Sequence, residues 1–360
     1  MKYIYKTTIL LFLIPLASLG NHHKKKHEKS KSIHKEFKVN ANAKVSVNNK
    51  YGTIKVTTWN KNVVEIDIKI TVKGNDIDNV EDKLEAIDVT FSNTSDFVNA
   101  KTIIGSKKTN WSWWGKHKKI NYQIDYLVKM PITNEVNLSN DYGAISLDEI
   151  NGNATINCDY GKITIGDLKG NTNSINLDYC SESTIHSMTN GFINTDYSKL
   201  VVDTAQKIDL NTDYSTIKFE KLTNLSFNAD YGSITVGESD TVAGNGDYTG
   251  LKFGTITGSL KIRSDYGYIK IQDLANGFDF IDINSEYAGI KIGTSPSNNF
   301  NFTIELQYAG FKQKNSPNIT LYKSISKSHK KYYEGVYGKG KPTSKMIIKS
   351  EFGSVSFKEN

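Results

Sequence analysis

A short motif, an acidic residue followed by tyrosine and then by a small residue, recurs along the chain at a nearly constant interval of about 18 residues. The tyrosines of its successive copies are Tyr142, Tyr160, Tyr179, Tyr197, Tyr214, Tyr231, Tyr248, Tyr266, Tyr287 and Tyr308. So many copies at a fixed period are typical of a solenoid, in which each repeat stacks on the one before it. A β-propeller needs about 40 residues per blade and fits this period poorly, and a β-sandwich is the other alternative.

The residues on either side of each tyrosine alternate between apolar and polar. Apolar residues stand four positions before the tyrosine and three and five positions after it, as Ile156, Ile163 and Ile165 do around Tyr160. Because side chains alternate between the two faces of a strand, this change from even to odd offsets requires a bulge or corner right after the tyrosine. The sequence therefore predicts an all-β fold, a β-solenoid similar to a single-stranded β-helix, with coils of about 18 residues. We expect the tyrosines to face inward as a structural ladder, and an outward aromatic strip that binds glycans is the alternative.

The acidic residue before each tyrosine forms a second column. Its aspartates are Asp141, Asp159, Asp178, Asp196, Asp213, Asp230, Asp247 and Asp265. Like charges stacked about 4.8 Å apart repel each other, so the column needs an explanation. The favoured one is structural: each Asp accepts the backbone N–H two residues on, in an Asx turn that builds the corner. Binding of cations or of a cationic partner is the alternative, and we expect no metal site and no cofactor.

Residues 1–20 have the features of an export signal. Lys2 and Lys6 precede the apolar run 9–16, which is too short to span a bilayer, and small residues follow before position 21. An uncleaved anchor or a buried strand is the alternative. We expect an exported protein, located in the periplasm, on the outer-membrane surface or outside the cell.

The regions around the regular coils have characters of their own. Residues 21–36 predict a flexible basic linker, with metal capture by His22, His23 and His27, or contact with an anionic surface, as alternatives. Residues 37–135 indicate strands with one short helix near 76–86, and should cap the N-terminal end of the coils, where backbone would otherwise stay unpaired. Residues 136–310 hold the regular coils. Over residues 311–360 the period fails, although the run 351–357 resumes the pattern, as expected of a last coil or C-terminal cap.

Three of the four tryptophans, Trp111, Trp113 and Trp114, lie together in a segment rich in lysine. Exposed aromatic rings beside cations suit sugar stacking or a membrane interface, which makes these three the candidate binding residues. The favoured alternative is a loop folded over the end of the solenoid as a plug.

The charged residues and the cysteines exclude some partners and linkages. The net charge of +7 comes almost entirely from lysine, with Arg263 the sole arginine. Since arginine is the usual reader of phosphates and guanine edges, nucleic acid is not expected as a partner. Cys158 and Cys180 would lie about 10 Å apart in neighbouring coils, so no disulfide is expected.

The order of these features resembles a known family. Tyr51-Gly52-x-Ile54-x-Val56 precedes a tryptophan, a later strand ends in Met130-Pro131, and coils of the form Asn-x-Asp-Tyr-Gly-x-Ile-x-Ile follow. Over about residues 37–360 the chain is similar to the DUF4097 family of adhesin-like β-strand-repeat proteins of bacterial envelopes, which is related to the adhesin head-domain families. The resemblance implies an envelope protein of a type common in Bacteroidota, and it carries over no catalytic residues.

Together these observations favour an exported, non-catalytic envelope protein, adhesin-like or scaffolding, that binds a surface protein or a glycan. Peripheral contact with a membrane stays open. An accessory role in envelope stress or anti-sigma signalling is one alternative. A carbohydrate-active β-helix enzyme is the other, but such enzymes place irregular loops and clustered carboxylates over one groove, whereas the coils between Tyr142 and Tyr266 are uniform.

Overall fold

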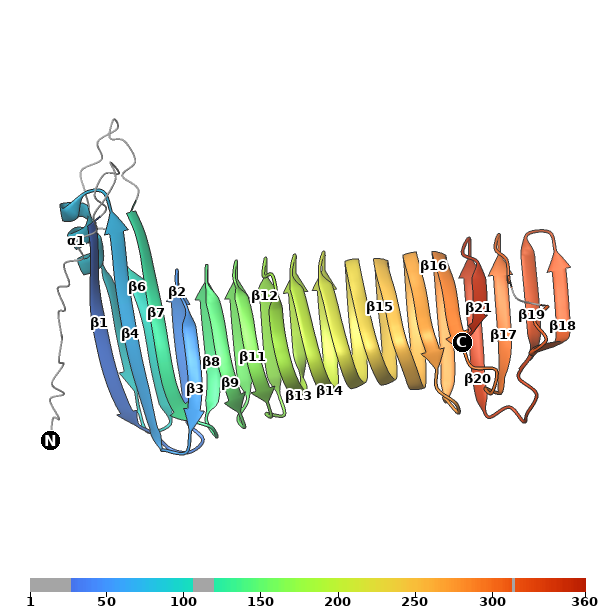
Figure 1. Ribbon diagram of the computed structural model, residues 1–360, viewed down its shortest axis with the longest axis horizontal. Coiled ribbons are helices and arrows are strands. Elements are labelled where there is room, and N and C mark those ends of the chain that lie inside the picture. Colours follow the sequence, from blue (N-terminus) through green and yellow to red (C-terminus); the bar gives the residue numbers. More distant parts are fainter. Residues whose placement is uncertain (1–26, 106–119, 313–314) are drawn as a thin grey trace. The chain divides into compact units, whose positions relative to one another are not determined.

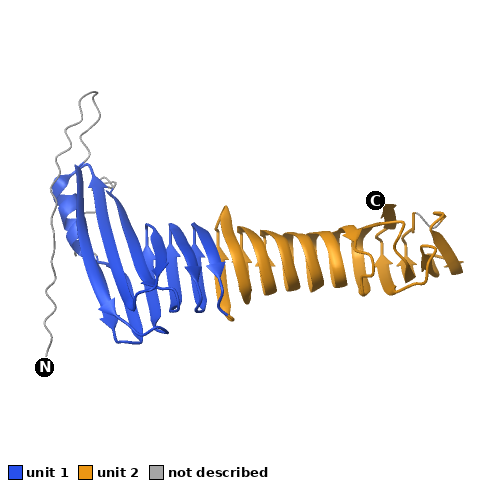
Figure 2. Cartoon of the chain, turned by 60° about the horizontal axis from the view of Figure 1, so that its bottom comes forward, with its two compact units in different colours: residues 1–170 blue, residues 171–360 orange. Residues whose placement is uncertain are grey.

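The computed structural model describes residues 27–105, 120–312 and 315–360. In these residues the protein is nearly all β, with a single helix, so the prediction of an all-β fold is confirmed (Figure 1). That helix is too short and too polar to cross a membrane. The chain divides into two compact units, residues 1–170 and residues 171–360, each described here by itself (Figure 2). The predicted export signal over residues 1–20 lies outside the described residues.

The strands of the first unit pair in two rows. The elements are β1 (His27–Lys38), β2 (Lys44–Lys50), β3 (Ile54–Trp59), β4 (Val63–Gly74), α1 (Ile77–Ala86), β5 (Ile87–Asn93), β6 (Phe97–Ile104), β7 (Ile120–Pro131), β8 (Glu135–Asp141), β9 (Ala144–Ile150), β10 (Ala154–Asp159) and β11 (Lys162–Leu168). One row runs β1, β4, β7, β3, β9, β11, and the other runs β5, β6, β2, β8, β10. Pairing is antiparallel among β1, β4 and β7 and between β5 and β6, and it is parallel elsewhere.

Parallel pairing in this unit sets equivalent residues of successive repeats side by side. Asp159 pairs with Asp141, and Ile163 pairs with Ile145. Alternate side chains along each strand are buried, which places the apolar positions of every repeat in one core. The short helix α1 begins after Asp76, whose carboxylate accepts a hydrogen bond from Asn79 N at 3.2 Å and so caps the helix.

The basic N-terminal segment differs from the expectation. Residues 27–36, which the sequence places in a flexible linker, form most of β1, and β1 pairs with β4 along its whole length. Ile33, Lys35 and Phe37 stand on one face of β1 and are half-buried, while His34 and Glu36 between them are exposed. Pairing with the edge of β4 satisfies that strand's backbone, and this outweighs the polar composition of β1.

The second unit continues with parallel pairing. Its elements are β12 (Asn173–Asp178), β13 (Ser183–Asp196), β14 (Lys199–Asp213), β15 (Thr216–Leu274), β16 (Phe280–Thr294), β17 (Phe300–Gln307), β18 (Ile319–Lys327), β19 (Lys330–Tyr337), β20 (Ser344–Glu351) and β21 (Val355–Glu359). β15 is long because its extended backbone continues through several repeats. Asp196 pairs with Asp213, and Asp213 pairs with Asp230, so the repeats again lie in register.

The C-terminal segment does not follow the order of the sequence. β20 pairs with both β16 and β17, and β21 pairs with β16, so residues 344–359 are inserted between two earlier strands. The run 351–357, expected as a last coil or cap, is therefore an internal layer of this unit. The hairpin of β18 and β19 instead follows β17 at the edge, through antiparallel pairing.

Neither Cys158 nor Cys180 forms a disulfide in the described structure, as the sequence predicts. Both thiols are buried.

The inserted segment should contribute strongly to the stability of the second unit. Phe357 is 3% exposed, and its ring packs against the rings of Phe300, Phe302 and Phe311. We predict that Phe357→Ala lowers the free energy of unfolding by about 3–5 kcal/mol, the usual cost of emptying a buried phenylalanine site. Urea unfolding measures this, with exposed Ile325→Ala as the control, and a loss below about 1 kcal/mol would contradict the inserted packing.

Candidate functional site

The motif tyrosines form a stacked column, which we call the tyrosine ladder. In the second unit the ladder consists of Tyr179, Tyr197, Tyr214, Tyr231, Tyr248, Tyr266, Tyr287, Phe352 and Tyr308, in the order of their stacking. Neighbouring rings there are nearly parallel, and the centroids of Tyr197 and Tyr214, for example, lie 4.8 Å apart. In the first unit Tyr51, Tyr142 and Tyr160 stack with centroids 5.1 Å apart.

The ladder lies on the surface, so the expectation of inward-facing tyrosines is wrong. The ladder tyrosines of the second unit are 43–52% exposed. Every ladder residue has a φ between 48° and 63°, in the left-handed region. A residue in this conformation breaks the strict alternation of side chains, so its ring turns outward although its neighbours two and four positions earlier point inward. The corner lies at the tyrosine itself rather than after it.

Hydroxyl groups of the residues that follow the tyrosines form hydrogen bonds at several corners. Ser198 and Ser215 directly follow ladder tyrosines, and both are buried. Ser198 Oγ donates to the carbonyl of Asp196 at 2.7 Å, and the backbone N–H of Ser198 donates to Ser215 Oγ at 2.9 Å. Thr249 Oγ1 bonds the carbonyl of Asp247 in the same way, at 2.8 Å. These hydroxyls satisfy backbone groups that the sharp turn would otherwise leave unpaired.

Glycine serves the same position in other copies because neighbouring repeats approach closely. A Cβ on Gly232 would lie 2.2 Å from the backbone oxygen of Ser215, and one on Gly161 would lie 1.9 Å from the oxygen of Gly143. Small residues after the tyrosine are thus required by the approach of one backbone to the next.

The aspartates beside the ladder do not build the corners as expected. In the described second unit, the carboxylates of Asp213, Asp230 and Asp247 make no hydrogen bond to the backbone two residues on, so the predicted Asx turn is not formed there. The corner is formed instead by the left-handed backbone of the tyrosines and by hydrogen bonds from the hydroxyl groups that follow them. Asp213, Asp230 and Asp247 are exposed alongside the ladder, and Asp178 and Asp196 of the same column are half-buried.

The column is electrostatically unfavourable within the second unit. Burial, together with the neighbouring carboxylates Asp213 and Asp247, raises the pKa of Asp230 above its usual range. Burial and the charge of Asp178 likewise raise the pKa of Asp196. Like charges held one repeat apart resist simultaneous ionisation.

Two positions of the column, one in each unit, hold a residue other than a carboxylate. In the first unit Lys50 pairs in register with Asp141, and its Nζ lies 2.6 Å from the carboxylate, which raises the pKa of Lys50. In the second unit Gln307 pairs with Glu351 and donates to its Oε2 at 3.3 Å. A cation or a neutral amide therefore fits the same place in the ladder.

We call the ladder and the carboxylates beside it the Tyr–Asp stripe. Because the rings cover each other's faces, the stripe presents ring edges, phenol hydroxyls and carboxylates at a fixed repeat. His329 covers the far face of Tyr308 at 4.4 Å, and Tyr122 packs edge-on against Tyr51 at 5.0 Å. Flat stacking of sugars on these rings is thereby restricted, whereas hydrogen bonding and attraction of cations are favoured.

Two other regions are candidates for binding a ligand. Trp111, Trp113 and Trp114 lie outside the described residues, so their role as a binding loop or a plug stays a prediction. A cavity of about 1180 Å³ in the second unit is lined by β15, β16 and β21, with Ile319 of β18 and Tyr337 of β19. Lysines and carboxylates alternate in its lining, among them Lys291 and Asp273, so it favours neither anions nor cations.

Removal of one ladder ring should test the balance between stacking and backbone strain. We predict that Tyr231→Ala lowers the free energy of unfolding by about 1–3 kcal/mol, because two stacked contacts are lost while the left-handed backbone remains. Tyr231→Gly should recover about 1 kcal/mol of this loss, since glycine adopts that backbone without strain. Exposed Tyr322→Ala is the control, and an equal loss for Ala and Gly at position 231 would contradict the argument.

The carboxylate column should destabilise the fold at neutral pH. Because the folded state raises the pKa of Asp196 and Asp230, it binds their protons more tightly than the unfolded state does. Stability therefore increases as the pH falls through the carboxylate range and is lower at pH 7. We predict that combined Asp213→Asn, Asp230→Asn and Asp247→Asn raises the melting temperature at pH 7 by roughly 2–4 °C in low salt.

Calorimetry at several pH values and salt concentrations checks this expectation. The gain should shrink in high salt, because mobile ions screen the repulsion, and also on acidification. Asp209→Asn, an exposed carboxylate outside the column, should change little. A lower melting temperature for the triple variant would show that the carboxylates stabilise the fold.

Comparison with known proteins gives a likeness in structure alone. No protein-family model and no curated protein matches the chain, so the resemblance to DUF4097 stays a prediction. A candidate adhesin from Parabacteroides distasonis is 12% identical, with a TM-score of 0.41, and the match covers 73% of this chain and 97% of that one. A candidate cell adhesion protein from Clostridium sporogenes is 10% identical, with a TM-score of 0.20, over 92% of this chain and 100% of that one. A candidate lipid-binding protein from P. distasonis is 13% identical, with a TM-score of 0.31, over 91% and 97%. Similarity at this level carries no argument about function.

Proposed function

We propose that the protein is an exported, non-catalytic, adhesin-like β-solenoid that binds a surface protein or glycan along its Tyr–Asp stripe. The observation that carries this proposal is the exposure of the stripe in both units. A stacked aromatic column on the surface is unusual, because apolar area of this extent is normally buried or used for binding.

The solenoid part of the proposal is supported by the register within each unit. Equivalent residues of successive repeats pair directly, as Asp213 and Asp230 do, and alternate side chains are buried throughout. We include the domain organisation in the proposal: an export signal over 1–20, a cap over 37–135, regular coils over 136–310 and a C-terminal region over 311–360. The proposal no longer includes a linker over residues 21–36, because residues 27–36 belong to β1.

Repetition suits the stripe to a repetitive partner. Each rung from Tyr179 to Tyr287 offers a phenol hydroxyl and a carboxylate, and the next rung offers them again about 4.8 Å further on. Weak contacts at many rungs combine into strong attachment when the partner repeats its own groups, since each further contact forms within the same complex. A polymer or a surface with regularly spaced hydrogen-bond donors has the required chemistry.

The uniformity of the stripe supports binding rather than catalysis. Catalytic acid and base pairs need environments that separate their pKa values. In this column the carboxylates occupy equivalent positions of successive repeats, and burial with a neighbouring carboxylate raises the pKa of both Asp196 and Asp230. We keep Trp111, Trp113 and Trp114 in the proposal as a separate binding region.

Binding to an array of immobilised glycans and to cultured host cells tests the proposal. One variant combines Tyr214→Phe, Tyr231→Phe and Tyr248→Phe with Asp213→Asn, Asp230→Asn and Asp247→Asn. It keeps the ring stack and removes the polar groups of three rungs. We expect it to melt no lower than the parent protein and to lose at least tenfold in apparent affinity, since several contacts are lost at once.

A second variant identifies which region binds. Replacing Trp111, Trp113 and Trp114 with Ala leaves the stripe intact, so retained binding would assign the activity to the stripe. Asp209→Asn serves as the surface control. Binding that survives both the stripe variant and the Trp variant would contradict the proposal, as would turnover of any bound glycan.

A further inference from the structure

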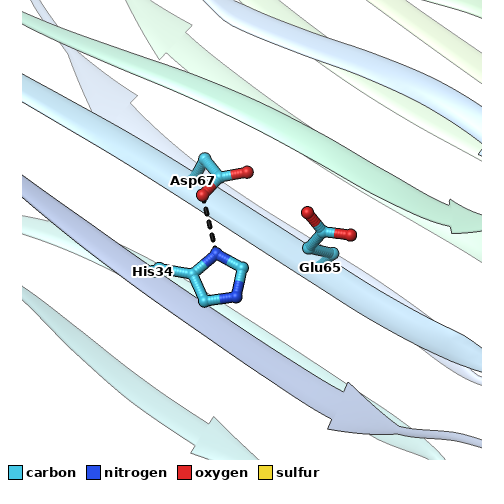
Figure 3. A group of neighbouring side chains, drawn as sticks. All are labelled: His34, Glu65 and Asp67. Carbon is cyan, nitrogen blue, oxygen red and sulfur yellow. Dashed lines mark hydrogen bonds and ion pairs between the residues drawn. The ribbon is translucent and has the colours of Figure 1, made fainter. Parts of the chain in front are cut away.

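Three potential metal ligands lie together on the first unit, away from the Tyr–Asp stripe. They are His34 on β1 and Glu65 and Asp67 on β4, and we call them the His34 cluster (Figure 3). One ligand atom from each residue lies within 4.8 Å of the others. Figure 3 shows the imidazole and both carboxylates grouped over the two adjoining strands.

Strand register brings the three side chains to one place. His34 pairs directly with Asp67 in the antiparallel ladder, and Glu65 lies two residues from Asp67 and therefore on the same face. β4 is held on both sides, by β1 and by β7, so the backbone that carries both carboxylates is fixed. Ligands on paired strands keep their positions better than ligands on loops do.

The imidazole is already oriented by a carboxylate. His34 Nδ1 and Asp67 Oδ1 lie 2.7 Å apart and form a hydrogen bond. His34 and Asp67 remain about half exposed, which leaves access from solvent. Glu65 is less exposed, at 23%.

Charged groups of both signs surround the cluster. Glu36 pairs with Glu65 across the strands and adds a third carboxylate to this face. Lys129, whose Nζ lies 3.3 Å from Glu65 Oε1, carries one positive charge. Lys55, Lys69 and Asp125 line one hollow together with His34 and Asp67. Positive and negative charges around the cluster therefore largely offset each other, and ion binding depends on the three ligand atoms themselves.

We propose that the His34 cluster is a binding site for a divalent transition-metal ion of the Zn²⁺ class. Imidazole nitrogen and carboxylate oxygen are both ligands that Zn²⁺ accepts, and three protein ligands leave coordination positions open for water or for a donor from a partner. Ca²⁺ and Mg²⁺ prefer sites made of oxygen atoms alone and are not expected to compete. Binding replaces the hydrogen bond between His34 and Asp67 with bonds to the ion, after a small separation of the two side chains.

The second unit contains a natural comparison. His186 and Asp203 also face each other on neighbouring strands, with Nδ1 and Oδ2 3.1 Å apart. Among the described residues, no third histidine, cysteine or carboxylate ligand atom lies within 4.8 Å of both. A histidine–aspartate pair is thus present in both units, and the additional carboxylate distinguishes the site.

Isothermal titration with ZnCl₂ on the chain without its export signal tests the proposal. The parent protein for this experiment carries His22→Ala, His23→Ala and His27→Ala, so that histidines near the N-terminus do not add binding of their own. We expect one equivalent of Zn²⁺ to bind to this parent. His34→Ala and Glu65→Gln should each weaken that binding at least tenfold, the lower limit for loss of groups that hold or orient a metal.

Two further variants make the result specific. Lys129→Met removes the competing ammonium group and should tighten binding by about twofold to fivefold, the size expected of a surface ion pair. His186→Ala is the matched control and should leave binding unchanged. Absorption of bound Co²⁺ provides an independent signal, which should disappear in His34→Ala.

The possible outcomes separate clearly. The proposal is supported if His34→Ala loses the one equivalent of bound Zn²⁺ while His186→Ala retains it. Circular dichroism must show that both variants are folded. Absence of saturable Zn²⁺ binding to the parent, or equal binding to the parent and to His34→Ala, overturns it. Displacement of Zn²⁺ by millimolar Ca²⁺ would also contradict the assignment. None of these results bears on binding by the Tyr–Asp stripe, so the two proposals fail independently.

Discussion

In-register pairing of parallel strands is the constraint on which both units depend. It places each residue against its equivalent in the next repeat, about one strand spacing away. The side chain at one position of the repeat is therefore repeated at every rung along the unit. Isoleucine in this arrangement gives a continuous core, tyrosine gives a stack of rings, and aspartate gives a row of charges that repel one another. Favourable and unfavourable consequences come from the same geometry.

The tyrosine ladder balances two energies of similar size. A left-handed backbone costs a residue other than glycine about 1–2 kcal/mol, and a stacked aromatic pair gains about 0.5–1.5 kcal/mol. Each added rung brings one left-handed residue and one new pair, so the stack roughly offsets the strain of the corner. Exposed rings can therefore be part of the fold and remain available to a partner.

The sequence predicts what recurs and misses what depends on single long-range pairings. The 18-residue period predicts that successive repeats are equivalent. The alternation of apolar and polar residues predicts the all-β fold, and its shift around Tyr160 predicts a corner. Parity also predicts an inward ring, and this fails because one left-handed residue breaks the alternation. The insertion of β20 between β16 and β17, and the meeting of His34 with Asp67, follow from strand order and register, which local patterns do not contain. The polar composition of residues 27–36 likewise hides a strand that a neighbouring edge stabilises.

The aspartates of the column are not required by the corner that they occupy. Hydroxyl groups such as that of Ser198 satisfy the backbone there, and Lys50 and Gln307 occupy equivalent places without disturbing the pairing. Partial burial and, after it, repulsion from Asp213 and Asp247 disfavour the ionised carboxylate of Asp230 in the folded state and raise its pKa. A residue that costs stability at many successive rungs, where neutral residues fit, is the kind of local conflict that proteins retain at functional sites. Under the proposed function the column serves recognition, and the carboxylates rather than the rings supply specificity, because the rings are already engaged with one another.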